Sequence, residues 1–134
     1  MAHQPHHHHD DHDAHAHGEH DEELEALQEC IEECLNCHAV CTNTAQLCLD
    51  KGERFADAAH VRLLLDCAQI CQASADFMLR GSDFHEATCA LCAEVCRACE
   101  ASCRELEDDE DLAACADVCA VCATSCARMA DMEA

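Results

Sequence analysis

Sixteen of the 134 residues are cysteines, and their spacing is the feature of this chain that could do chemistry. Most successive cysteines are three or four residues apart. They are Cys30, Cys34, Cys37, Cys41, Cys48, Cys67, Cys71, Cys89, Cys92, Cys96, Cys99, Cys103, Cys115, Cys119, Cys122 and Cys126. Thiolates are soft ligands that favour Cu(I), Zn(II) and iron–sulfur clusters. The pattern therefore predicts binding of soft metal ions by many thiolates.

The number of thiols favours Cu(I) among these metals. Structural zinc needs four converging ligands at a discrete site, and iron–sulfur clusters are held by small sets of cysteines. Cu(I) accepts two or three sulfur ligands, which neighbouring thiols can supply repeatedly along a rod. Each Cu(I) held by two thiolates leaves one buried negative charge, which is costly unless more copper enters. We therefore expect multinuclear loading on the order of one Cu(I) per cysteine, about sixteen.

The same spacing predicts the elements that position the thiols. Residues at i, i+3, i+4 and i+7 lie on one face of an α-helix, so each segment carries its thiols as one stripe. We predict helices over about 21–50, 53–80, 83–106 and 110–129. Gly52 and Gly81 mark helix ends, and Asp83 with Glu86 predicts an N-cap for the third helix. Acids at 108–111 complement the positive end of the fourth helix.

Helices joined by connections of a few residues are antiparallel neighbours. The predicted fold is an all-α, antiparallel up-down-up-down four-helix bundle with a Cys-lined core over 22–134. Residues 1–21 hold nine of the twelve histidines, interleaved with Asp, and predict a disordered tail. Those histidines could bind Cu(II), Ni(II) or Zn(II), or raise the local copper concentration.

The two ends of the predicted tube differ in composition. One end gathers Leu27, Met78, His85 and Met129. The other gathers Leu64, Leu106 and Leu112, together with His60. Thioether and imidazole groups can pass Cu(I) to thiolates, so we expect Met78, Met129 and His85 to line a mouth for copper transfer, with His60 as the alternative at the other end. His38 lies one place off its stripe and is expected to be exposed or flanking.

Composition excludes several other functions. The net charge of −22 comes from 29 acids against 7 bases, which argues against nucleic-acid binding. We see no apolar run of about 18 residues for a membrane span and no export signal, so we expect a cytoplasmic protein whose thiols are reduced. No nucleophile with an orienting base and no phosphate-binding loop is present, so we do not expect an enzyme.

Two further questions stay open at this level. A metallothionein-like zinc or mixed-metal buffer would retain zinc better than copper, and a thiol redox protein would have a few accessible cysteines of low pKa. A second apolar row on the second helix, Leu63, Ile70 and Phe77, either forms an oligomer interface or packs inside the protomer.

Taken together, these motifs resemble the cytosolic branch of the copper storage protein family over about residues 22–130. The resemblance rests on Cys30-x3-Cys34-x2-Cys37-x3-Cys41, Cys67-x3-Cys71, Cys89-x2-Cys92-x3-Cys96-x2-Cys99-x3-Cys103 and Cys115-x3-Cys119-x2-Cys122-x3-Cys126. It implies a Cys-rich four-helix bundle that stores many Cu(I) ions, with all sixteen cysteines as candidate ligands. It also implies a homotetramer with the metal inside each protomer. A copper donor or acceptor protein is a further expected partner.

Overall fold

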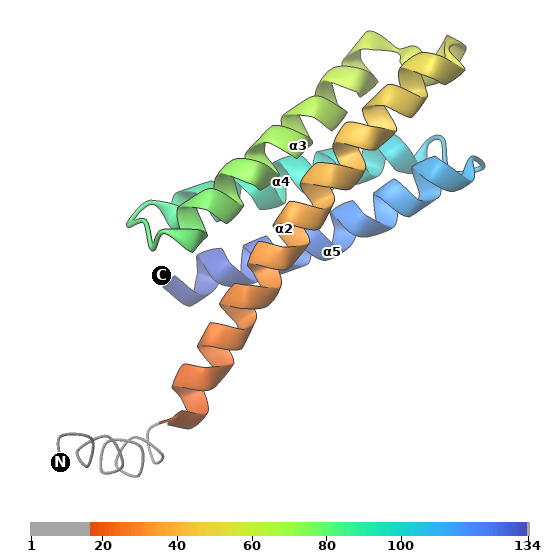
Figure 1. Ribbon diagram of the computed structural model, residues 1–134. Helices are drawn as coiled ribbons and strands as arrows, with labels where there is room; N and C mark the ends of the chain where they lie inside the picture. The colour runs from red at the N-terminus through yellow and green to blue at the C-terminus, as the bar shows by residue number, and fades with distance from the viewer. Residues whose placement is uncertain (1–16, 134) are drawn as a thin grey trace, which may run out of the picture.

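The computed structural model describes residues 17–133, which form four long α-helices and one short 3₁₀ helix (Figure 1). In chain order these are α2 (His17–Lys51), η2 (Glu53–Ala56), α3 (Ala58–Leu79), α4 (His85–Arg104) and α5 (Glu110–Glu133). Each long helix packs against its neighbours in sequence, and α2 also packs against α5, which closes the ring. The predicted antiparallel four-helix bundle is confirmed.

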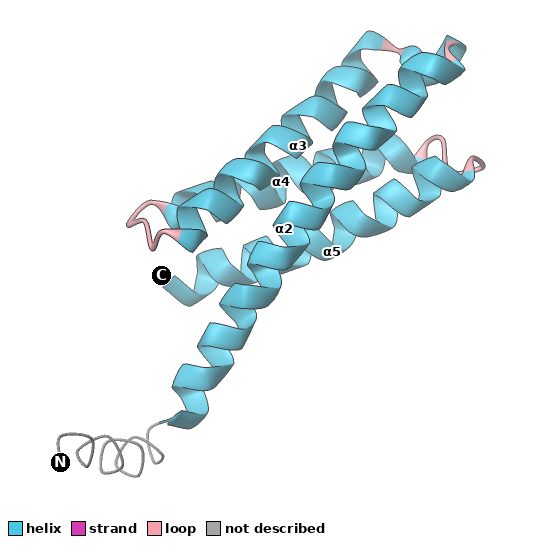
Figure 2. Ribbon diagram, viewed as in Figure 1, coloured by secondary structure: helices cyan, strands magenta, loops and turns pink. Residues whose placement is uncertain are grey.

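The connections lie at two opposite ends of the bundle (Figure 2). The α3–α4 connection lies beside the last turns of α5, at the end that we call the methionine end, defined by Leu27, Met78, His85 and Met129. The α2–α3 and α4–α5 connections lie at the leucine end, defined by Leu64, Leu106 and Leu112. The first turns of α2 extend beyond the methionine end, away from the other helices (Figure 1).

The helix boundaries differ in places from the prediction. Helix α2 begins at His17, so 17–21, which we assigned to the tail, are helical, while 1–16 lie outside the described residues. The predicted second helix is divided, because η2 ends at Ala56 before α3 begins. Asp57 makes this break, since its side chain accepts a hydrogen bond of 3.2 Å from the backbone N–H of His60 and caps α3.

Gly52 and Gly81 each end a helix with a positive φ, 73° and 64° respectively. At Gly81 the N–H of Ser82 donates to the carbonyl of Phe77 at 2.9 Å, the six-to-one bond of a Schellman motif. The predicted cap of α4 by Asp83 is wrong. Phe84 is the N-cap residue and makes no side-chain cap, and the Ser82 hydroxyl instead accepts from the Phe84 N–H at 3.0 Å.

The start of α5 agrees with its acidic signal. One carboxylate oxygen of Asp109 accepts hydrogen bonds from the N–H groups of Asp111 and Leu112, at 2.9 and 3.3 Å. This is an N-cap with negative charge at the positive end of the helix dipole.

Helix α5 also corrects the expectation that no segment is apolar enough to span a membrane. The segment Glu110–Asp131 meets that criterion by length and composition, with a mean hydropathy of 1.4. Its apolar character comes from alanines and a cysteine stripe, and the bundle buries 44% of the window. A core helix with this composition meets the same criterion without crossing a bilayer.

Candidate metal centre

The four cysteine stripes meet along the axis of the bundle. All sixteen thiols have a relative exposure of 0% and none forms a disulfide. The stripes converge because every helix places its cysteines at helical period and turns that face inward. Reactive redox cysteines need access to solvent, so complete burial argues against the redox alternative.

Adjacent thiols are close enough to share a metal ion. Thirteen pairs of Sγ atoms lie 3.4–4.0 Å apart, and eleven of these pairs join different helices. Cys34 and Cys126 are 3.4 Å apart, and Cys71 lies 3.6–3.8 Å from Cys92, Cys96 and Cys122. The contacts form one continuous network rather than isolated pairs.

Four sets of thiols converge within this network, each with all its Sγ atoms within 4.8 Å of one another. They are Cys30–Cys89–Cys126, Cys34–Cys92–Cys122–Cys126, Cys37–Cys71–Cys96–Cys122 and Cys37–Cys41–Cys67–Cys119. Successive sets along the axis share a member: Cys126, then Cys122, then Cys37. Four thiols belong to no set, namely Cys48, Cys99, Cys103 and Cys115, and all come from the leucine-end parts of their helices.

At the methionine end, the residues predicted to line the mouth lie just beyond the outermost cysteines of the four stripes. Met78 and Met129 are 3% exposed and belong to the buried core, whereas Leu27 and His85 are half-buried. The ring nitrogen Nδ1 of His85 is 2.9 Å from the carbonyl oxygen of Ser82, which orients the imidazole. Two buried thioethers therefore lie at this end of the core, together with two groups that are partly accessible to solvent.

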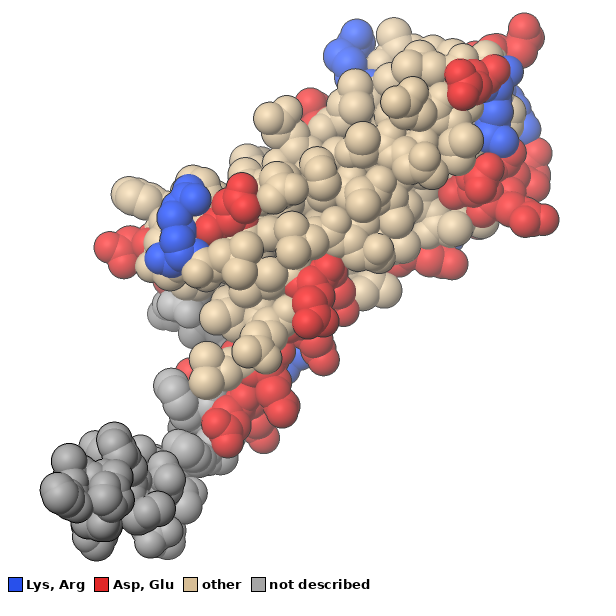
Figure 3. All heavy atoms as spheres, viewed as in Figure 1, with Lys and Arg blue, Asp and Glu red and all other residues tan. Residues whose placement is uncertain are grey.

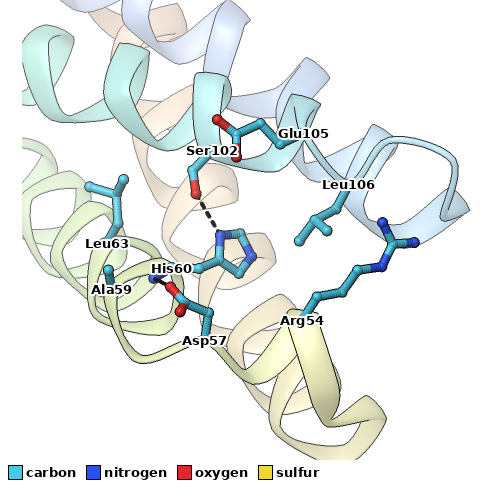
Figure 4. A pocket seen from close by; sticks show the side chains of 8 residues that line it. All are labelled: Arg54, Asp57, Ala59, His60, Leu63, Ser102, Glu105 and Leu106. Carbon is cyan, nitrogen blue, oxygen red and sulfur yellow. Dashed lines mark hydrogen bonds between the residues drawn. The ribbon is translucent and has the colours of Figure 1, made fainter.

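At the leucine end, Leu64 and Leu112 are fully buried and close the tube. His60 lies beside them with 6% exposure, and its Nε2 is 3.6 Å from the Sγ of Cys48. On the other side of the ring, Nδ1 is 2.6 Å from the hydroxyl oxygen of Ser102 (Figure 4). The pair of Cys48 and His60 thus offers one sulfur and one nitrogen ligand, with the imidazole held in place by α4.

Burial shifts the pKa values of Cys48 and His60 and so determines their protonation states. It raises the pKa of the Cys48 thiol to about 11, with nearby Cys115 and Asp109 acting in the same direction. It lowers the pKa of His60, so the ring is neutral at pH 7 with a nitrogen lone pair available for a metal. A pocket of about 550 Å³ leads from solvent to His60 between Asp57 and Leu106 (Figure 4).

One polar contact of this region, that of Ser102, was not predicted from the sequence. Ser102 lies beside the cysteine stripe rather than on it, so no periodicity indicates its contact with His60. His38 is half-buried, as a flanking position would be, and its Nδ1 is 2.8 Å from the carbonyl oxygen of Ala68. Of the second apolar row, Leu63 and Ile70 pack against the core of their own protomer, which favours the intramolecular explanation for them.

Comparison with known proteins identifies the family to which this chain belongs. The family model described as copper storage protein matches residues 23–131. The chain belongs to the copper storage protein family. This confirms the resemblance to the copper storage protein family and the prediction of a non-enzymatic copper storage protein.

Several relatives support the membership. The Nmul_A1745 protein from Nitrosospira multiformis superposes with a TM-score of 0.75 at 40% identity, covering 81% of this chain and 97% of that one. The Cu(I)-bound copper storage protein BsCsp3 gives 0.74 at 34% identity, over 78% and 98%. A cytosolic copper storage protein from Streptomyces lividans, solved with five coppers, gives 0.74 at 34% identity, over 81% and 95%.

A curated relative extends the comparison by sequence. The uncharacterized cysteine-rich protein YhjQ of Bacillus subtilis is 35% identical over 82 residues, which are 61% of this chain and 76% of that protein. The S. lividans protein has also been solved loaded with ten copper equivalents. Homologues of this chain thus carry multiple copper ions in a bundle of the same architecture.

Proposed function

We propose that this chain stores Cu(I) on its sixteen cysteines, as multinuclear clusters along the bundle axis. The observation that carries the proposal is the continuous thiol network, in which every Sγ is buried and thirteen pairs lie within bridging distance. Cu(I) bridged by thiolates of neighbouring helices neutralises them, and complete filling leaves no net charge in the core. We expect about one Cu(I) per thiolate.

The copper-loaded relatives support this assignment, since both are copper storage proteins that are 34% identical to this chain. Copper is then the cargo, and no covalent chemistry is required of the protein. The protein presents thiols that lose their protons when copper binds, and the Cu–S bonds offset the cost of this deprotonation. The bundle also excludes water and oxidants from the bound Cu(I).

An anaerobic titration tests the proposal. The reduced protein is titrated with Cu(I) against a competing chromogenic chelator, and bound copper is counted per protomer. We expect saturation near sixteen, and saturation at four or fewer would overturn the proposal. Cys99→Ser and Cys122→Ser serve as a matched pair, because the first lies outside the converging sets and the second belongs to two of them. The Cys122 variant should lose more copper.

Copper uptake is proposed at the methionine end. Met78 and Met129 are the buried groups next to the thiol network there, and His85 is the partly accessible one. Exposed acids of α2, among them Glu25, Glu29 and Glu32, lie near this end and would attract cations (Figure 3). His60 with Cys48 is the alternative route, through the pocket at the leucine end.

The histidine-rich N-terminal segment is proposed to deliver copper to this end, because the described part of α2 begins there. Deleting residues 1–16 should slow copper uptake and leave capacity unchanged. An unchanged rate would remove the delivery role.

A tetramer in the cytoplasm is proposed for the assembled protein. The family resemblance implies four protomers, and one relative is described as cytosolic. The groove between α2 and α3, of about 510 Å³, supports self-association because Asp76 is the one charged side chain among the residues that line it. Leu65 lines this groove and is 48% exposed. Sedimentation should show a tetramer, which Leu65→Glu should weaken and Leu91→Glu should leave intact. Fractionation of the source cells tests the cytoplasmic location.

A further inference from the structure

Among the converging sets that contain four thiols, two have no member in common. The first is Cys34–Cys92–Cys122–Cys126 and the second is Cys37–Cys41–Cys67–Cys119. Each draws its thiols from three helices, and each is fully buried. The chain therefore holds two independent tetrathiolate cages, which we call the upper cage and the lower cage, in that order from the methionine end.

The cages have the dimensions of a tetrahedral divalent site. A zinc ion 2.3 Å from four sulfurs at tetrahedral angles holds those sulfurs about 3.8 Å apart. In the upper cage, Cys34 lies 3.4 Å from Cys126 and 3.7 Å from Cys122. In the lower cage, the Sγ of Cys37 lies 3.8, 3.9 and 4.0 Å from those of Cys41, Cys67 and Cys119. The other sulfur–sulfur separations within each cage are at most 4.8 Å, so small side-chain movements would bring both cages to zinc geometry.

From these dimensions we propose that the copper-free protein binds two Zn(II) ions per protomer, one in each cage, as placeholders that Cu(I) later displaces. The binding of zinc stands on the cage geometry alone, whereas its displacement rests on the proposed copper storage. Zinc would hold eight of the sixteen thiols as thiolates in fixed positions, and so protect them from forming disulfides with neighbours at 3.4–4.0 Å before copper arrives.

The net charge buried in the core explains why Cu(I) displaces zinc. Two Zn(II) on eight thiolates leave four buried negative charges, whereas eight Cu(I) on the same thiolates leave none. The exchange balances as eight Cu(I) entering and two Zn(II) leaving, with the eight Zn–S bonded sulfurs rebonded to copper. No proton and no oxidant is consumed, because the thiols have already been deprotonated when zinc bound.

The sharing of thiols limits the number of zinc ions to two. The set Cys37–Cys71–Cys96–Cys122 lies between the cages and uses one thiol of each, so it cannot be filled while either cage is occupied. The set Cys30–Cys89–Cys126 shares Cys126 with the upper cage. Sixteen thiols treated as equivalent would instead allow four zinc ions.

The experiment is an anaerobic zinc titration of the reduced protein against a chromogenic zinc chelator. The chain used lacks residues 1–16, a deletion that removes most of the tail histidines. Co(II) serves as the spectroscopic probe of tetrahedral sulfur coordination. We expect two ions per protomer with tetrathiolate Co(II) spectra. Saturation at none or at four, or an octahedral Co(II) spectrum, would overturn the proposal.

Serine variants then test the arrangement. Cys34→Ser removes the upper cage and Cys67→Ser the lower, so each variant should hold one zinc on four thiolates. The double variant should still hold one in this way, because the middle set becomes available. Adding Cys71→Ser should abolish tetrathiolate binding and its Co(II) spectrum, because only the three-thiol set Cys30–Cys89–Cys126 then remains intact. Cys103 belongs to no set, so the Cys103→Ser variant should still bind two zinc ions. Loss of zinc in Cys103→Ser, or no binding to the double variant while it remains helical, would contradict the cages.

Copper titration of the same samples separates the two proposals. Uptake of about sixteen Cu(I) with no zinc binding overturns the cages alone. Two zinc ions that Cu(I) fails to displace would overturn the placeholder role and count against copper storage.

Discussion

The two ends of the bundle are built by different means, although the thiol network between them is continuous. At the leucine end, aliphatic side chains close the tube, and ion pairs tie the connections together: Lys51 lies 3.0 Å from Asp109, and Arg54 lies 2.8 Å from Asp108. At the methionine end, the core stops at two thioethers. Thioethers are soft and adaptable, and branched aliphatic groups offer no ligand. The comparison supports the proposal that one end is built for closure and the other for passage.

The strongest test of closure is Leu112→Ala at the leucine end. This side chain is fully buried, so its truncation should reduce the free energy of unfolding of the copper-free protein by about 3 kcal/mol, from lost burial and the cavity left behind. Urea denaturation of the reduced protein measures it. Leu91→Ala is the control, since Leu91 is 49% exposed and should cost under about 0.5 kcal/mol. Equal effects would mean that the leucine end is not closed by packing.

The strongest test of passage is the double variant Met78→Leu with Met129→Leu. Leucine conserves the volume and removes the sulfur, so stability should change little. Copper uptake should slow by about tenfold, as expected if about 1.4 kcal/mol of ligand stabilisation is lost at the rate-limiting transfer. Stopped-flow mixing with a Cu(I)–chelator complex measures the rate. His60→Gln is the matched change at the other end, and a slower rate there with normal uptake in the methionine variant would reverse the comparison.

A smaller effect should distinguish the two aspartates of the α4–α5 connection. Asp109 both caps α5 and pairs with Lys51, whereas Asp108 makes only an exposed ion pair with Arg54. Asp109→Ala should therefore lower the urea midpoint more than Asp108→Ala. If both substitutions leave the midpoint unchanged, the ion pairs and cap do not contribute to closure of the leucine end.

The smallest effect expected is a pH dependence from His60. Burial lowers its pKa in the folded protein, so the unfolded chain takes up a proton at a higher pH than the folded chain does. Stability of the copper-free protein should therefore decrease as the pH falls below about 6.5. His60→Gln should show a smaller loss between pH 7.5 and pH 5.5 than the parent chain. An identical loss would mean that this imidazole does not control acid sensitivity.

Most of the fold could be predicted because one residue type carries the helical period. The cysteine stripes define which face of each helix is inside, and the short connections define antiparallel neighbours. Boundaries were less predictable, because caps depend on competing local hydrogen bonds. Asp83 was expected to cap α4, yet the Ser82 hydroxyl takes the Phe84 N–H. The break at Asp57 is of the same kind.

The sequence by itself determined the all-α bundle, the thiol-lined core and the soft-metal chemistry, because helical period and ligand type are local properties of the chain. Only the tertiary structure decided which thiols converge, that the leucine-end thiols Cys48, Cys99, Cys103 and Cys115 join no converging set, and that His60 meets Cys48 and Ser102. Those contacts depend on the relative rotation and axial offset of separate helices. Side-chain packing across the whole bundle sets both quantities, and no spacing within one helix records them.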